Sequence, residues 1–303
     1  MKQFKARCSA LSQIMSNPLG GSNLDKYNDL CVSIAETKTK IEACSENAIK
    51  TKEKLVKKLA ELEKEKKILE PKKDEIKLSK TCITHVENWI KETYYGRSFQ
   101  IDTMPIRKGN ETEIEATALV SAFLNEKLTR DNKTLSNDYL TGHLDIDWVE
   151  KRIIIDTKVC KDFSTFPILD KEIELAYYWQ GQGYMDLTEY DECWFAKCAI
   201  NTPLHELERM EKATWFRLMD IYGDESSEYF QADHEEFLKN LFMAHVIDNS
   251  ISIKGYTLDS FEIAEIPKEN RVKIIKVQRN QADIDLIKPR VEEIRQFLKQ
   301  NNY

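Results

Sequence analysis

The chain has 303 residues, a length that suits one domain with an appendage. Its 45 lysines and arginines and 52 aspartates and glutamates give a formal charge of −7. This balance excludes a uniformly basic, histone-like DNA binder, but not an enzyme with a local basic groove. With 9 glycines and 7 prolines, a collagenous or low-complexity chain is excluded as well.

The N-terminal third is predicted to be helical. Residues 1–23 are expected to form a loose leader. From 24 to 91 apolar residues recur on a seven-residue step, which is typical of long helices packed along one seam. Pro71 predicts a kink or hairpin turn near 70–73. Two interpretations stay open for this segment, a helical hairpin that leans on the rest of the protein or an arm that grips DNA or a partner.

From residue 94 onward the pattern changes to mixed α/β. Pro289 is expected to mark where the regular part of the last helix begins. We therefore expect two domains, a helical arm over 1–93 and an α/β domain over 94–303. In the second domain helices are predicted at 111–128, 171–187, 204–222, 235–246 and 284–299, and strands at 139–148, 152–158, 192–200 and 271–278.

Acidic and basic residues gather where the first two of these strands are joined. Asp156 and Lys158 are two apart in a strand, so their side chains leave the same face, and a short antiparallel turn brings Asp145 near Asp156. Neighbouring carboxylates repel each other unless a cation or a proton intervenes, and hard oxygen ligands favour Mg²⁺ or Mn²⁺. The alternative is an ordinary strand end at solvent. Asp147, on the same strand face as Asp145, is the fallback ligand if the register differs.

Two of the predicted helices carry further candidates. Glu113 lies in the first turns of the helix at 111–128, where acidic residues are favoured in any case. Gln180 and Tyr184 are four apart and share one face of the helix at 171–187. Gly181 and Gly183 each cost that helix about 1 kcal/mol relative to alanine, which predicts close approach by another backbone.

Cysteine usage and hydropathy bear on cofactors and compartment. The seven scattered cysteines include no C-x-x-C pair, so neither zinc nor an iron–sulfur cluster is expected. A reducing cytoplasm is the expected location. No stretch approaches the ~20 apolar residues that span a bilayer, and the N-terminus has no apolar signal-peptide core, so no membrane partner is expected.

Four motifs follow one another along the chain, namely Gly109-x-x-x-Glu113, Gly142-x-x-Asp145, Asp156-x-Lys158 and Gln180-x-Gln182-x-Tyr184-Met185. In this order they resemble the motifs of the PD-(D/E)XK nuclease superfamily, and most nearly its phage lambda-exonuclease-like branch of viral recombinases and RecB-type nuclease domains. The resemblance covers about residues 107–200. It departs from that branch at Asp156, where Glu is more frequent, and in lacking the proline that often precedes this second acid.

The resemblance implies a restriction-endonuclease-like fold, in which helices flank a mixed β-sheet, and metal-dependent hydrolysis of phosphodiester bonds. It implies that one or two Mg²⁺ ions, with Mn²⁺ as the substitute, are held by Glu113, Asp145, Asp156 and the carbonyl of Thr157. Lys158 would position or help deprotonate the attacking water. Gln180 would orient the water, the lysine or a metal ligand. Tyr184 is expected to support the site, and so is His143, although for His143 a packing role is favoured.

The resemblance also implies partners. Double-stranded DNA ends are the expected substrate, while a single-strand annealing partner and a homo-oligomer are left open. Arg97, Arg107 and Lys108 precede the first motif and are candidates for contacts with DNA phosphates. The favoured function is a phage or prophage exonuclease that resects DNA ends for recombination. The alternatives are an endonuclease on the same scaffold and a non-catalytic helical recombination protein with a nuclease-like core, and the complete motif set favours an enzyme.

Overall fold

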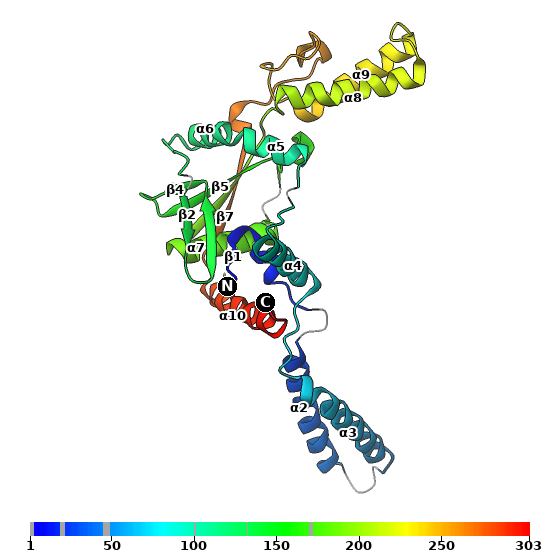
Figure 1. The fold of residues 1–303 in the computed structure, drawn as a ribbon, viewed down its shortest axis with the longest axis vertical. Coiled ribbons are helices and arrows are strands. Elements are labelled where there is room, and N and C mark those ends of the chain that lie inside the picture. Colours follow the sequence, from blue (N-terminus) through cyan, green and yellow to red (C-terminus); the bar gives the residue numbers. More distant parts are fainter. Residues whose placement is uncertain (1–2, 19–21, 45–48, 100, 132, 170–171) are drawn as a thin grey trace. The chain divides into compact units, whose positions relative to one another are not determined.

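The computed structural model describes residues 3–18, 22–44, 49–99, 101–131, 133–169 and 172–303 (Figure 1). The chain forms two compact units, which are described separately below. One unit consists of Met1–Ala6, Ala10–Ser98 and Asp285–Tyr303, and the other of Arg7–Ser9 and Phe99–Ile284. The domain boundary expected after residue 93 falls inside helix α4 (Lys80–Tyr95) and stays a prediction. Within the described residues, no helix combines the length and apolar composition needed to cross a bilayer.

Two long helices lie within the predicted arm. Helices α2 (Asn23–Glu42) and α3 (Ile49–Leu69) run side by side in Figure 1. Ser22 begins α2 with a capping box, because its hydroxyl accepts from the Asp25 amide at 3.0 Å and the Asp25 carboxylate accepts from the Ser22 amide at 3.2 Å. The turn predicted near 70–73 is confirmed as the 3-10 turn η2 (Glu70–Lys72). The break between α2 and α3 was not predicted, and residues 45–48 within it lie outside the described residues.

The prediction of a loose leader is wrong for residues 4–14. Strand β1 (Ala6–Arg7), the 3-10 turn η1 (Cys8–Ala10) and helix α1 (Leu11–Ile14) are short, and their apolar side chains are buried. Arg290 of helix α10 (Gln281–Gln300) donates to the Ile14 carbonyl at 2.7 Å. Elements of two to four residues are too short to show periodicity, which is why the pattern missed them. The prediction that the last helix becomes regular only at Pro289 is also wrong, because α10 begins at Gln281 and contains that proline.

The second unit is built on a mixed sheet with the strand order β4-β5-β6-β7. The β4–β5 and β6–β7 pairs are antiparallel, and the central β5–β6 pair is parallel. A second sheet has the order β1-β3-β2. This mixed α/β arrangement confirms the expected fold class. The strands are β2 (Lys133–Ser136), β3 (Leu140–Leu144), β4 (Ile146–Trp148), β5 (Ile153–Val159), β6 (Glu192–Cys198) and β7 (Val272–Gln278).

Helices cover both faces of this sheet (Figure 1). On one face α6 (Glu113–Leu124) packs Ala116 and Val120 against Ile153 and Ile155 of β5. On the other face α7 (Leu175–Thr188) packs against Ile154 and against β6. Strand β5 is therefore buried on both sides, as its isoleucine run predicted. The remaining helices of this unit are α5 (Met104–Glu111), α8 (Leu204–Tyr222) and α9 (Glu228–His245), and the remaining 3-10 turns are η3 (Phe163–Thr165), η4 (Asp259–Phe261) and η5 (Lys268–Asn270).

Several predicted elements have different bounds in the structure. The strand predicted at 139–148 is divided at Asp145 into β3 and β4, and the helix predicted at 111–128 is preceded by the unpredicted helix α5, with the break at Thr112. Helix α8 has the predicted bounds, whereas α9 begins at Glu228 rather than at 235. Helix α7 begins at Leu175, and residue 171, its predicted beginning, lies outside the described residues.

Candidate active site

Strand β5 places an acid and a base side by side. The Lys158 Nζ lies 2.6 Å from Oδ1 of Asp156, so the prediction that these two side chains share a strand face is confirmed. The Asp156 side chain is 3% exposed and that of Lys158 is 28% exposed. The Lys158 ammonium also lies 5.3 Å from the ring centroid of Tyr177. An acid this deeply buried needs a charged or hydrogen-bonding partner, and Lys158 is one.

Asp145 lies at the junction of β3 and β4, beside the middle of β5. Residue Ile146 pairs with Ile155 in the antiparallel register, which brings Asp145 level with Asp156 and Thr157. The Asp145 Oδ2 accepts hydrogen bonds from the Thr157 amide at 2.8 Å and from the Thr157 hydroxyl at 3.0 Å. These two bonds fix the carboxylate against β5, and they explain why the chain breaks its strand at this residue.

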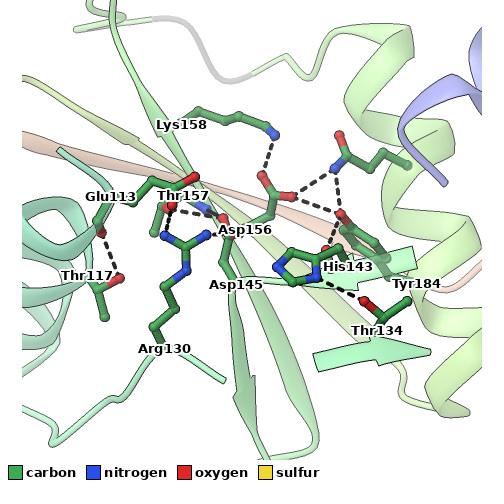
Figure 2. Close-up of polar contacts among 11 residues, drawn as sticks. Glu113, Thr117, Arg130, Thr134, His143, Asp145, Asp156, Thr157, Lys158 and Tyr184 are labelled. Carbon is green, nitrogen blue, oxygen red and sulfur yellow. Dashed lines mark hydrogen bonds and ion pairs between the residues drawn. The ribbon is translucent and has the colours of Figure 1, made fainter. Parts of the chain in front are cut away.

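Helix α7 holds Asp156 from the other side (Figure 2). The Gln180 Nε2 donates to Oδ2 of Asp156 at 2.8 Å and to the Tyr184 hydroxyl at 2.7 Å. The Tyr184 hydroxyl lies 2.9 Å from the carbonyl of His143 and 3.3 Å from Asp156 Oδ2. Gln180 and Tyr184 thus form a buried hydrogen-bond network around one carboxylate. The roles expected of them in catalysis stay predictions.

Glycine permits this close packing. A Cβ on Gly142 would lie 2.9 Å from Cys8 Sγ and 3.0 Å from the Tyr184 ring. A Cβ on Gly181 would lie 3.2 Å from the ring of Phe195 in β6. The expected close approach by another backbone is wrong for Gly181, because the nearest atoms belong to side chains of β6.

Glu113 begins α6 and is joined to Asp145 by an arginine. Figure 2 shows the Arg130 guanidinium between the two carboxylates. Its Nη1 bonds Oε2 of Glu113, and its Nη2 lies 3.9 Å from Oδ1 of Asp145. Arg130 was not predicted as a site residue, because a lone arginine between a helix and a strand carries no periodic or motif signal.

The electrostatics of the site favour bound cations. Burial raises the pKa of the Asp156 carboxyl, the Lys158 ammonium opposes this rise, and the neighbouring Asp145 adds to it. Burial alone would lower the pKa of Lys158, but the carboxylates of Asp156 and Asp145 outweigh it and raise that pKa. Burial and Asp156 also raise the pKa of Tyr184, which keeps its hydroxyl neutral. Negative charge is therefore concentrated here and held by cationic side chains.

The side chains and the carbonyl at this site are of the types that bind a hard divalent cation. The carboxylates of Glu113, Asp145 and Asp156 and the backbone carbonyl of Thr157 are oxygen donors of the type that Mg²⁺ and Mn²⁺ prefer. Arg130 already places a shared cation between two of these carboxylates. As the described side chains stand, no group of three histidines, cysteines, aspartates or glutamates is close enough to hold a metal ion. That all three carboxylates share one metal stays a prediction.

The remaining candidates have partners of other kinds. Asp147 lies 3.7 Å from Lys133 Nζ, and its role as the fallback metal ligand stays a prediction. His143 is exposed and its Nδ1 lies 3.2 Å from the Thr134 hydroxyl, so it does not pack in the core. Arg97 is exposed.

Two of the proposed DNA-contacting residues have protein partners in the structure. Arg107 forms a fork with Glu206, with its Nη2 at 3.1 Å, and its Nη1 lies 2.7 Å from Asp102. Lys108 is only 2% exposed and donates to the Lys161 carbonyl at 3.2 Å. Contacts of Arg97, Arg107 and Lys108 with DNA phosphates stay predictions.

Solved structures resemble this chain. A phage-related exonuclease from Haemophilus somnus 129PT is similar over 99% of this chain and 95% of its own, with a TM-score of 0.59 and 21% sequence identity. An alkaline exonuclease from Laribacter hongkongensis has a TM-score of 0.42 and 13% identity, over 74% of this chain and 86% of that one. No protein-family model and no curated protein matches the chain. The first likeness shows that the chain has the fold of a phage-related exonuclease, as the motifs predicted.

Proposed function

We propose that this protein is a metal-dependent DNA nuclease, and specifically an exonuclease that resects duplex ends in phage or prophage recombination. The observation that carries the proposal is the meeting of Asp145, Asp156, Lys158 and Gln180 around the middle of β5. These four residues come from three separate motifs, and their contacts with one another support a shared role in phosphodiester hydrolysis. The likeness to a phage-related exonuclease supports the same conclusion.

Each residue has a distinct task in this proposal. Glu113, Asp145, Asp156 and the carbonyl of Thr157 hold Mg²⁺ or Mn²⁺, which when bound activates water and stabilises charge on the phosphate. Lys158, anchored by Asp156 at 2.6 Å, offsets the negative charge that grows on the phosphate oxygens. Gln180 acts through Asp156, because both of its amide contacts go to Asp156 and Tyr184. It is therefore a positioning residue in this structure.

The substrate is proposed to be duplex DNA that presents an end. The neighbour's description as an exonuclease supports this choice over an endonuclease. The proposal includes a single-strand annealing protein as partner and assembly into a homo-oligomer.

The test uses purified full-length protein, Mg²⁺ and three forms of one plasmid, namely linear, nicked circular and covalently closed DNA. An exonuclease degrades the linear form and leaves the closed circle intact. An endonuclease converts the closed circle to linear DNA, which would replace the specific proposal but keep the nuclease. If no form is degraded with Mg²⁺ or Mn²⁺, the protein is not a nuclease under this account and the non-catalytic interpretation takes its place.

A further inference from the structure

We propose that Arg130 is a positioning residue that competes with the divalent cation for Glu113 and Asp145, and so sets the affinity of the metal site. The inference rests on the proposed function, because it takes these two carboxylates as metal ligands. Its basis is the placement of one guanidinium between oxygens of both residues, on Oε2 of Glu113 and 3.9 Å from Oδ1 of Asp145 (Figure 2).

The contact geometry distinguishes Arg130 from a purely structural arginine. Arg107, in the same unit, bonds Glu206 through Nε and Nη2 and Asp102 through Nη1, so all three of its nitrogens have partners. Among the described residues, Arg130 uses only its two terminal nitrogens, and its buried Nε has no hydrogen-bond partner there. A buried unsatisfied donor costs free energy, so Arg130 is held here by the two carboxylates rather than by a fitted set of acceptors.

The ion pairs of Arg130 with Glu113 and Asp145 are partly buried. The side chains of Arg130 and Asp145 are 17% and 18% exposed, and that of Glu113 is 38% exposed. A partly exposed ion pair contributes little net stability, and a divalent cation attracts the same oxygens with twice the charge. The guanidinium can therefore be displaced, while it still reduces the repulsion between the carboxylates before the metal binds.

The two carboxylate oxygens of Asp145 have different partners, which supports the proposed competition. Its Oδ2 is fixed by the Thr157 amide and hydroxyl at 2.8 and 3.0 Å, so Oδ1 faces Arg130. A metal that binds Oδ1 and Glu113 does not need to break the bonds that hold Asp145 on β5. Only the arginine has to move.

The experiment measures Mn²⁺ binding by electron paramagnetic resonance in the absence of DNA, so that no turnover is involved. Arg130→Gln is expected to bind Mn²⁺ about three- to tenfold more tightly than wild type, because the competing charge is gone. Arg130→Lys keeps the charge and is expected to stay within about twofold of wild type. Arg152→Gln makes the same charge change just before β5, where Arg152 donates to the Glu189 carbonyl at 2.6 Å. It is the matched control and should leave the affinity unchanged.

Equal or weaker Mn²⁺ binding by Arg130→Gln would overturn the inference, because it would make Arg130 irrelevant to the ligands or necessary for arranging them. Equal tightening by Arg130→Lys and Arg130→Gln would overturn it too, since charge would not be the cause. If wild type itself shows no saturable Mn²⁺ binding that Glu113→Gln weakens, the proposed metal site fails, which is a separate result from a failure of the competition.

Discussion

The side-chain amide of Gln180 donates to the carboxylate of Asp156 at 2.8 Å and thereby joins helix α7 to strand β5. The same amide donates at 2.7 Å to the Tyr184 hydroxyl, which lies 2.9 Å from the backbone carbonyl of His143 on β3. One oxygen of Asp156 is fixed by this network, so the other faces Lys158. The orientation of the buried acid is therefore determined by residues far away in the sequence.

This network makes Gln180→Leu a test of positioning. The change removes both donated bonds and leaves an apolar side chain of similar size beside a buried carboxylate. We expect turnover on linear duplex DNA to fall roughly 10- to 100-fold, as is typical when a residue that orients a metal ligand is lost. Tyr184→Phe, which keeps the ring and the Gln180–Asp156 bond, should lose much less. Equal losses in both variants would show that general packing, rather than the amide, supports Asp156.

Two glycines allow a paired test of packing. Gly142→Ala places a Cβ 2.9 to 3.1 Å from Cys8, Tyr184 and Leu187, so it should destabilise the protein by roughly 1–3 kcal/mol. Gly109→Ala lies in helix α5, where the new Cβ would meet no described atom within 4 Å beyond its chain neighbours and the backbone of its own helix. It should stabilise the protein by up to about 1 kcal/mol. Urea unfolding of both variants checks the opposite signs. A Gly142→Ala protein as stable as wild type would contradict the packing described here.

Lys108 predicts a pH dependence of stability. Burial lowers its pKa from 10.5 to about 8, with nearby Cys160, Asp162 and Glu115 opposing the shift. Below pH 8 the buried charge destabilises the folded state. Between pH 8 and 10.5 the unfolded chain binds the proton that the folded chain has lost, so this group makes stability rise with pH. Lys108→Met should therefore be more stable than wild type at pH 7, by a margin that shrinks towards pH 10.

Urea unfolding at pH 7 and pH 9.5 measures that margin. A Lys108→Met protein that is less stable than wild type at pH 7 would mean that the hydrogen bond to the Lys161 carbonyl outweighs the cost of the buried charge. The same variant also tests the DNA contact expected from the sequence. An unchanged salt dependence of DNA binding would remove Lys108 from the candidates for phosphate contacts.

We expect the hairpin formed by helices α2 and α3 to affect how long the protein stays bound to DNA, and not the hydrolysis itself. Asn23 Nδ2 donates to the Lys72 carbonyl at 2.9 Å, so a short linker can replace residues 24–71 without touching the buried Cys82 and Val86 of α4. Helix α3 carries eight lysines and four glutamates. We expect the deletion to keep hydrolysis of short duplexes and to weaken salt-sensitive binding to long DNA.

Processivity at two salt concentrations measures the effect of the deletion. If the shortened protein folds but loses hydrolysis of short DNA as fully as an Asp156 variant, the hairpin belongs to the catalytic machinery. If it retains processivity at low salt, the lysines of α3 do not contact DNA.

The sequence predicted the central part of the fold better than its edges. Strand β5 and helix α8 carry long, regular apolar patterns, and their predicted bounds agree with the structure to within a residue or so. The break at Asp145 was not predictable from periodicity, because hydrogen bonds from Thr157 to the Asp145 side chain cause it. The N-terminal elements were missed because Phe4 and Leu11 are buried by tertiary contacts rather than by a repeating pattern.

The candidate site, like the fold, was only partly predictable from the sequence. Motif spacing predicted that Asp156, Lys158, Gln180 and Tyr184 belong to one site, and in the structure these four side chains lie together. Arg130 was missed because it belongs to no motif and reaches the site only through the fold. Residues that act through long-range contacts leave no local pattern, and this limits what spacing alone can predict.

The most direct test of the central claim is Mg²⁺-dependent release of nucleotides from linear duplex DNA by Asp156→Asn. The substitution keeps the size of the side chain and removes the charge that anchors Lys158 at 2.6 Å. Thermal unfolding in chelator confirms that the variant is folded. The account predicts that the folded variant loses essentially all nucleotide release while wild type degrades the DNA. Release at the wild-type rate by folded Asp156→Asn would contradict it.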